Sequence, residues 1–353
     1  MTKHGIFKGV MIAMVLTLAG YSVQAQSAAE EEAESAPVSS SRESIPSHVS
    51  GTQEKDGKTL TIEADVSASG IEHVKEATVV FDENLLGRFL NKVIGTEDHH
   101  AEEKENEFGV HYWTTGNDGL DGSVVSLEDI GSVEYIDWEQ DRSLDVLEED
   151  GTHMFEYGYM SEQIPSTMTI SATEASEKAA DFLKEYSCMD FQPWNILAWG
   201  DEGMQDGYYE IGLQGVLDGI PVSVKCDSDM RPLRTTVCYA DEGIFFLQGV
   251  FLLSEQESRT ITELVPFDDV LANFRDAFPN LCEGEGVEVD AIRLEYFPQL
   301  AEDQTFLLKP VWCFACTGSR EENYDGTVQE IRSSYDVLYY AENGKPCGVY
   351  FLM

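Results

Sequence analysis

The segment WCFAC at residues 312–316 has the C-x-x-C spacing with which paired thiols can carry out thiol–disulfide exchange. That chemistry needs the first cysteine at a helix N-terminus, where the helix dipole lowers the thiol pKa. Here the pair ends a strand-like apolar run, and residues 317–320 continue without a helical pattern. Residues three apart on a strand point to opposite faces. We therefore interpret Cys313 and Cys316 as structural, and keep a thiol-disulfide oxidoreductase using this pair as the alternative function.

A partial match to a calcium-binding loop lies at residues 117–128, NDGLDGSVVSLE, with Asp121, Gly122 and Glu128 at suitable positions. Asn at the first position and Gly at the third weaken or remove two ligands, and the preceding segment reads as a strand where a helix is required. We favour a plain turn here.

Two adjacent histidines, His99 and His100, lie among the acidic residues of 97–103. No second His or Cys cluster at ligand spacing supports a metal site, so a solvated acidic loop is the better interpretation. The sequence has no GxSxG, HExxH, Walker or GxGxxG pattern. We assign no catalytic, cofactor-binding or metal-binding residue, and no cofactor.

Four aromatic residues gather in one stretch of the chain: Trp194, Trp199, Tyr208 and Tyr209. Core packing is the simpler explanation for them. A peptide- or glycan-binding face is the alternative, because tryptophan and tyrosine combine an apolar body with a polar tip.

The first 25 residues predict export. Lys3 and Lys8 precede an apolar run over residues 10–18, and Val23-Gln24-Ala25 is a small-residue cleavage site. The run is far shorter than the ~20 residues that a membrane span needs. Tyr21 stands where a lipoprotein would need its lipid-bearing cysteine. We expect a secreted, extracytoplasmic protein that is cleaved after Ala25 and is not lipid-anchored.

The formal net charge of −44 restricts the partners of the chain. A polyanion of this size repels nucleic acid and anionic membrane surfaces, and favours cationic partners or divalent ions. The most direct interpretation is a solvated acidic surface.

All seven cysteines lie between residue 188 and the C-terminus. In an exported chain an odd count leaves at least one thiol unpaired. The spacing does not say which of the others pair.

The remaining sequence predicts an α+β fold with a disordered acidic linker over residues 26–50 and an N-terminal α+β domain over 51–162. In that domain Asp82 is placed to cap a helix that ends at Gly95. Two units follow, over residues 163–258 and 259–353, each with one helix and then several strands.

The helices of these units have clear sequence signals. Ser171 and Glu174 form a capping box, which predicts that the first helix runs to about residue 186. In the second unit Pro266 suits the first helical position and Pro279 predicts the end of the helix. Phe274 lies on its apolar face and should be buried.

Five segments carry a resemblance to known proteins: residues 170–186, ISATEASEKAADFLKEY; 264–271, LVPFDDVL; 292–299, IRLEYFPQ; 307–315, LLKPVWCFA; and 337–346, VLYYAENGKP. The first resembles a PepSY-type unit. The others are similar to the C-terminal unit of a family of exported Gram-positive proteins with tandem PepSY-like units, distantly similar to extracytoplasmic regulators of a cell-wall sensor kinase. The resemblance implies two helix-on-antiparallel-sheet units and a regulatory role.

The sequence therefore favours an exported, non-catalytic binding or regulatory protein of the cell envelope. Its expected partner is an envelope or secreted protein or peptide, with a cationic surface suited to the charge of the chain. We expect no nucleic acid and no direct insertion into the membrane.

Overall fold

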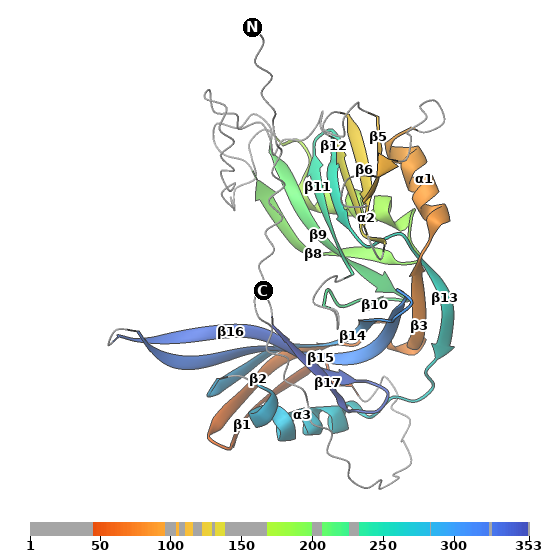
Figure 1. Cartoon of the computed structure of the whole chain (residues 1–353). Coiled ribbons are helices and arrows are strands. Elements are labelled where there is room, and N and C mark those ends of the chain that lie inside the picture. Colours follow the sequence, from red (N-terminus) through yellow and green to blue (C-terminus); the bar gives the residue numbers. More distant parts are fainter. Residues whose placement is uncertain are drawn as a thin grey trace. The chain divides into compact units, whose positions relative to one another are not determined.

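The structure is a computed structural model that describes residues 45–95, 104–105, 110–115, 122–128, 131–137, 168–199, 207–225, 233–282, 284–324 and 327–351. The fold is α+β, as predicted: two large sheets with helices packed on them (Figure 1). Three α-helices lie in the described ranges: α1 (Glu83–Val93), α2 (Ala172–Lys184) and α3 (Phe267–Leu281). None of them is long and apolar enough to cross a membrane.

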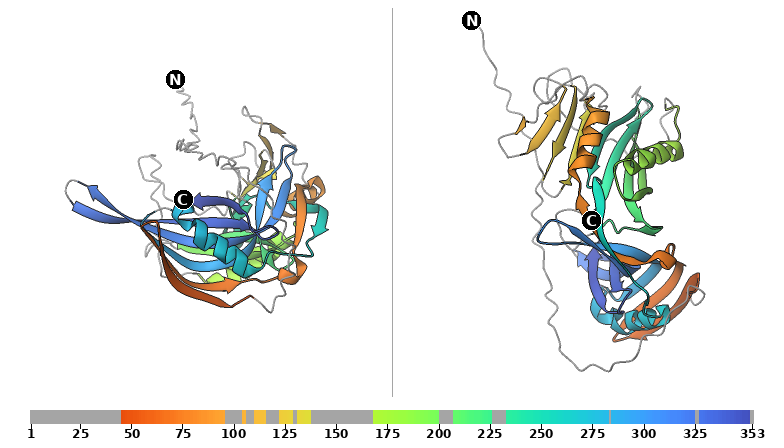
Figure 2. Two further views of the ribbon diagram at one scale, coloured as in Figure 1. Left: turned by 90° about the horizontal axis from the view of Figure 1, so that it is seen from below. Right: turned by 90° about the vertical axis from the view of Figure 1, so that its right-hand side faces the viewer.

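One sheet, called sheet A below, has eight strands. Its main order is β1 (His48–Lys55), β2 (Lys58–Ser67), β14 (Gly286–Leu300), β15 (Phe306–Tyr324), β16 (Thr327–Tyr340) and β17 (Pro346–Phe351); β3 (Lys75–Phe81) pairs with both β15 and β13 (Leu253–Thr260). All of these pairs are antiparallel except β2 with β14. The β15–β16 hairpin extends well beyond the rest of its sheet (Figure 2).

The other sheet, sheet B, has nine strands and is antiparallel throughout. Its main order is β10 (Ile220–Pro221), β9 (Tyr208–Leu217), β11 (Arg234–Ala240), β12 (Gly243–Gly249), β7 (Val133–Asp137), β6 (Ser123–Leu127), β5 (His111–Thr114) and β4 (Lys104–Glu105); β8 (Asp190–Trp199) pairs with β9. A short 3₁₀ helix, Ile71–His73, precedes β3.

Strands from the predicted N-terminal segment, residues 51–162, join both sheets. The segment expected as a separate N-terminal domain contributes β1, β2 and β3 to sheet A, and α1 with β4 to β7 to the layers of sheet B. Side-chain alternation in Leu60, Ile62 and Ala64 of β2 shows that one face is buried, but it does not show which strand lies alongside. That strand is β14, more than two hundred residues later in the chain.

Helix α3 covers one face of sheet A (Figure 1). Phe274 is fully buried, as predicted, and its ring stacks on Phe314 of β15 with centroids 4.3 Å apart. Pro266 directly precedes the first helical residue, Phe267. The hydrophobic core between helix and sheet therefore follows the predicted apolar face.

The prediction that Pro279 ends this helix is wrong, because α3 continues to Leu281. Proline has no N–H, so the carbonyl of Arg275, four residues earlier, loses its helical partner. The side chain of Gln53 on β1 donates a hydrogen bond to that carbonyl at 3.2 Å. Lys55 donates to the carbonyl of Asp276 at 2.8 Å. Side chains from β1 thus support the last turn, which the sequence around Pro279 alone could not reveal.

Helices α1 and α2 share one core on a single face of sheet B. Phe89 of α1 lies at its centre, in edge-to-face contact with Tyr186 after α2 and Phe251 after β12. Asp82 caps α1 and Ser171 caps α2, each accepting a hydrogen bond from a backbone N–H of the first turn. Both predicted caps are confirmed.

Several strands were not expected from the sequence. β1 begins at His48, within the predicted linker, whose earlier part lies outside the described residues. The sequence predicts strands near residues 60–64, 74–81, 110–113, 133–136, 208–217, 220–225, 233–240, 244–253, 287–296, 305–316, 333–341 and 347–351, and one near 154–160 that lies outside the described residues. β6, β8 and β13 are additional to these. Strand prediction depends on the alternation of apolar and polar residues. Most of these strands are short or lie in polar segments, where that alternation is weak.

Candidate functional site

Cys313 and Cys316 lie on strand β15, on opposite faces of sheet A. Cys316 belongs to the core under α3, whereas Cys313 packs with Phe297, Val311 and Leu338 on the other face. Both are buried, and neither forms a disulfide. Burial raises the pKa of the Cys313 thiol well above its ordinary value, and the nearby carboxylates of Glu295 and Asp336 raise it further.

This placement lacks what thiol–disulfide exchange by the pair requires. The first cysteine has no helix N-terminus to stabilise its thiolate, and the two sulfurs do not face each other. Trp312 beside them is a core residue as well, with its ring 4.8 Å from that of Phe267 on α3. The WCFAC segment is therefore a piece of scaffold.

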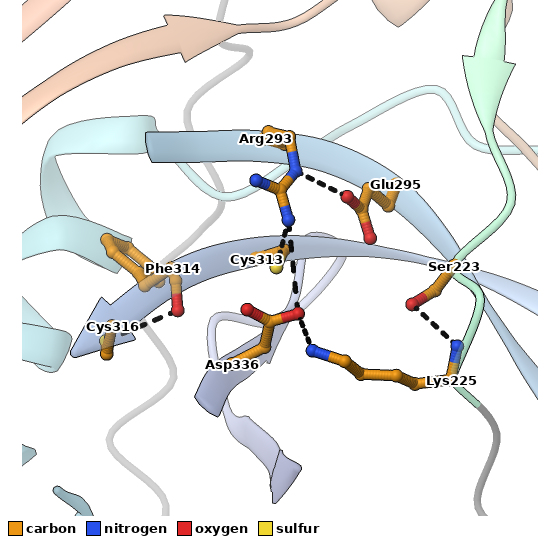
Figure 3. Close-up of polar contacts among 8 residues, drawn as sticks. All are labelled: Ser223, Lys225, Arg293, Glu295, Cys313, Phe314, Cys316 and Asp336. Atoms are coloured by element: carbon orange, nitrogen blue, oxygen red, sulfur yellow. Dashed lines mark hydrogen bonds and ion pairs between the residues drawn. The ribbon is translucent and has the colours of Figure 1, made fainter. Parts of the chain in front are cut away.

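A cluster of charged residues lies next to Cys313, on the face of sheet A opposite α3 (Figure 3). Arg293 of β14 donates to Glu295 at 2.7 Å, and its guanidinium lies 3.9 Å from Asp336 of β16. Lys225, which follows β10, forms an ion pair with the same Asp336. The Glu295 and Asp336 side chains are 8% and 7% exposed, so both carboxylates are nearly dry.

The cluster contains two cations and two carboxylates and is close to neutral. Each buried carboxylate has a cationic partner, which is the condition under which a buried charge is tolerated. The segment after β10 is attached to sheet A twice. Val222 and Ser223 pair with the backbone of Tyr296 on β14, and Lys225 adds its ion pair with Asp336 on β16. These ion pairs join β14, β16 and the segment after β10, so we interpret the cluster as structural.

The sequence-based search missed this cluster. Arg293 and Glu295 stand two apart and alternate with apolar residues in the segment 292–297, IRLEYF, of β14, and that alternation was the available signal. Asp336 similarly interrupts an apolar run in β16. Each pattern places a charge on a buried face, but only the strand register shows that the charges meet.

The possible calcium loop and the histidine-containing acidic segment lie largely outside the described residues. The histidine-rich acidic segment, residues 97–103, lies outside the described residues, as do residues 117–121 of the possible calcium loop. The rest of that loop enters β6, where Val124 pairs with Ile136 of β7. Among the residues that the structure describes, no group of three or more His, Cys, Asp or Glu is placed to hold a metal ion.

The aromatic residues of sheet B divide between its two faces. Tyr209 is fully buried in the core under α1 and α2, and its hydroxyl donates to the carbonyl of Ile170 at 3.2 Å. Alternation along β9 therefore directs Tyr208, Glu210 and Gly212 to the opposite face. Core packing is the correct interpretation for Tyr209. Tyr208 is half-buried on the other face, where its ring makes an edge-to-face contact with the buried Phe245 at 5.2 Å between centroids.

On this opposite face the indole of Trp199 stacks on Tyr208, with ring centroids 6.3 Å apart and planes inclined by 19°. The Trp199 indole N–H donates to a carboxylate oxygen of Glu210 at 2.9 Å. Both aromatic side chains are partly exposed. The stack is thus held in a fixed orientation, with an acidic group beside it.

Trp194 of β8 lies on the same face, directly over the backbone of Gly212. A Cβ at residue 212 would lie only 2.7 Å from the Trp194 indole nitrogen, so glycine is needed for this close contact. Trp194 is 45% exposed and stands out as the exposed large hydrophobic side chain of the described residues. We call Trp194, Trp199, Tyr208, Glu210 and Gly212 together the aromatic face.

None of the three described α-helices covers the aromatic face, because the α1 and α2 side chains pack on the other side of sheet B and α3 packs on sheet A. Three rings, one of them nearly half exposed, and one carboxylate form a platform on a rigid antiparallel sheet. Such a platform can hold an apolar, planar or cationic group by ring contact and charge. It has no nucleophile and base in contact.

Comparison with solved structures shows the fold and little more. A crystal structure of an uncharacterized protein from Eubacterium rectale ATCC 33656, at 1.45 Å resolution, has a TM-score of 0.56 and 17% identity, covering 85% of this chain and 93% of that one. The Bacillus megaterium YpeB C-terminal domain is distantly similar, with 12% identity and coverage of 77% and 98%; its TM-score of 0.30 supports no argument. No family model and no curated protein matches the sequence.

Proposed function

We propose that this chain is an exported, non-catalytic binding or regulatory protein of the cell envelope, and that its partner binds the aromatic face of sheet B. The observation that carries the proposal is Trp194, a large apolar side chain held in the open on Gly212. An exposed indole beside a second, stacked aromatic pair is typical of interaction surfaces, where tryptophan and tyrosine supply much of the binding energy.

The partner is a protein or peptide with a basic segment. Glu210 places a carboxylate beside the Trp199–Tyr208 stack, and a Lys or Arg side chain over such rings gains about 0.5–1 kcal/mol at an exposed site. The net charge of −44 attracts a cationic partner over a longer range. The predicted signal peptide and the resemblance to PepSY-type units agree with a role in regulating another exported protein.

The alternative, a thiol-disulfide oxidoreductase that uses Cys313 and Cys316, receives no support from their positions. The two thiols lie on one strand and face different cores.

The experiment compares capture from envelope extracts by four immobilised proteins: wild type, Trp194→Ala, Gly212→Ala and Lys178→Ala. Gly212→Ala keeps the indole but forces it to move, since the added Cβ would meet it at 2.7 Å. Lys178 is an exposed residue of α2, whose core contacts lie on the other face of sheet B, and it serves as the matched control.

We expect wild type and Lys178→Ala to retain the same protein, and both aromatic-face variants to lose most of it. Retention should also weaken as salt is raised, because exposed charges are screened. Equal retention by all four proteins, or no specific retention by wild type, would contradict the proposal.

A further inference from the structure

Strands β15 and β16 of sheet A continue past the rest of the sheet as a two-stranded arm (Figure 2). β14 pairs with β15 no further along than Ser319, and β17 pairs with β16 only from Tyr335 onward. Beyond these limits, residues 320–324 pair with residues 327–331 and with no other strand that the structure describes. The arm therefore lacks the neighbours that strands in the body of the sheet have.

The outer edge of β16 is open along residues 327–334, TVQEIRSS, because none of the described strands pairs with it there. Sheets commonly protect an edge with proline, lysine or a bulge. This stretch contains no proline or lysine, and its register with β15 has no shift. The neighbouring edge strand β17, by contrast, begins with Pro346 and shifts its register with β16. A two-stranded hairpin is only marginally stable in water, so an added strand would stabilise the arm.

We propose that the added strand is the same stretch of a second copy of this chain, so that two β16 strands pair antiparallel and form a homodimer. A symmetric pair of this kind has its two-fold axis perpendicular to the sheet. Residues opposite each other point to the same face of the sheet, and neighbouring residues point to opposite faces. The axis must therefore pass through a residue that faces its own copy, and not between two residues.

Charge selects that residue. An axis at Glu330 pairs residues 327–333 and an axis at Ile331 pairs residues 328–334, whereas any other position gives a shorter pairing within the open stretch. An axis at Glu330 would place two like charges opposite each other, which is destabilising. An axis at Ile331 places two half-buried isoleucines in contact and sets Glu330 opposite Arg332 of the second copy, once on each side of the axis. The axis at Ile331 is therefore favoured.

The rest of the structure accommodates this register. The new pairing ends at Ser334, and β17 begins to pair with the same edge of β16 at Tyr335, so the two strands do not compete. Arg332 already donates to Glu288 at 2.8 Å and lies 3.7 Å from Glu330 of its own chain. Its guanidinium carries five N–H donors and can bind a carboxylate of the second copy without losing these contacts.

The dimer is weak and reversible. A single strand pair is a small interface, and two chains with a net charge of −44 repel each other. Added salt screens this repulsion, so dimerisation strengthens with salt. The aromatic face is on sheet B and takes no part in this contact, and retention of its partner weakens with salt.

Cysteine cross-linking of the folded chain tests both the contact and its register. Residues opposite each other in an antiparallel pair have Cα atoms about 4.5–5.5 Å apart, within disulfide range. Ile331→Cys should therefore form a covalent dimer under mild oxidation. Gln329→Cys should not, because its own copy lies four positions further along, at about 13 Å; mixed with Ser333→Cys, which it faces, it should form the link. Wild type treated in the same way controls for links through the native cysteines.

Sedimentation equilibrium gives a second measurement that needs no added thiol. Wild type should show a concentration-dependent equilibrium between monomer and dimer. Glu330→Arg should weaken dimerisation about tenfold, since two symmetric pairs change from attraction to repulsion. Adding Arg332→Glu should restore it. Asp290→Arg, which makes the same change in net charge at an exposed position on β14, should not weaken it.

A wild type that stays monomeric at every concentration overturns the proposal, as does an Ile331→Cys protein that links no more than wild type. Efficient linking by Gln329→Cys alone also contradicts it, because the contact then has a different register. The wild-type sedimentation result stands without any variant, so it decides even where a variant fails to fold.

Discussion

The two sheets differ in what the side chains do on the face that lies opposite the packed helices. In each sheet the described α-helices pack on one face, and the opposite faces differ. In sheet A that face is closed by Arg293, Glu295 and Asp336, whose charges bind one another and Lys225. In sheet B it displays Trp194 over Gly212. A face whose polar groups are all paired internally holds the fold together, and a face with an exposed ring has capacity left for a partner.

The largest expected effect tests the helix-covered face of sheet A. Phe274→Ala removes a fully buried ring that stacks on Phe314, and should lower the free energy of unfolding by about 3–5 kcal/mol. Chemical denaturation of the variant and wild type measures the difference. An unchanged midpoint would mean that α3 does not pack on this sheet.

The charged cluster provides the next effect. Asp336→Ala leaves Lys225 without its buried ion-pair partner, and should cost about 3 kcal/mol, the lower end for a broken buried pair since Arg293 keeps Glu295. The matched control is Asp290→Ala, an exposed acid on β14. If both variants unfold at the same denaturant concentration, the cluster contributes nothing and the contrast between the sheets loses its basis.

A smaller effect is expected at the end of α3. Gln53→Ala removes the side chain that donates to the Arg275 carbonyl left open by Pro279, at a cost of about 0.5–1.5 kcal/mol. Its exposed neighbour on β1, Glu54→Ala, is the control. Thermal melts of the two variants should separate them, and identical melts would show that the side chain plays no part in supporting the helix.

The smallest effect on stability belongs to the aromatic face. Trp194→Ala should change the free energy of unfolding by no more than about 0.5 kcal/mol, because the indole is nearly half exposed. The same denaturation experiment tests this. A loss comparable with that of Phe274→Ala would mean that Trp194 is part of the core, and would remove it as an interaction residue.

The sequence predicted elements well where their signals are local. The caps Asp82 and Ser171 and the apolar face around Phe274 depend on residues within one or two turns, and all three are confirmed. The end of α3 was mispredicted because the group that compensates for Pro279 comes from β1, far away in the sequence. Local patterns cannot report such a partner.

The same reason limits what the sequence reveals of the candidate sites. The cluster of Trp194, Trp199 and Tyr208 was visible, but only the pairing of β8 with β9 shows which aromatic residues leave the core. The C-x-x-C spacing drew attention to Cys313 and Cys316, but alternation along β15 places the two thiols in different cores on opposite faces of sheet A. Spacing along the chain identifies candidates, and strand register decides which of them meet.

The most direct test of the central claim replaces Trp194 with a photo-crosslinking amino acid and irradiates the protein in the presence of envelope extract. The control carries the same amino acid at Lys178 on α2. We predict one abundant protein or peptide adduct from position 194 that is absent from position 178 and that weakens with salt. Equal labelling at the two positions, or no adduct at 194, would contradict the assignment of the aromatic face as the binding surface.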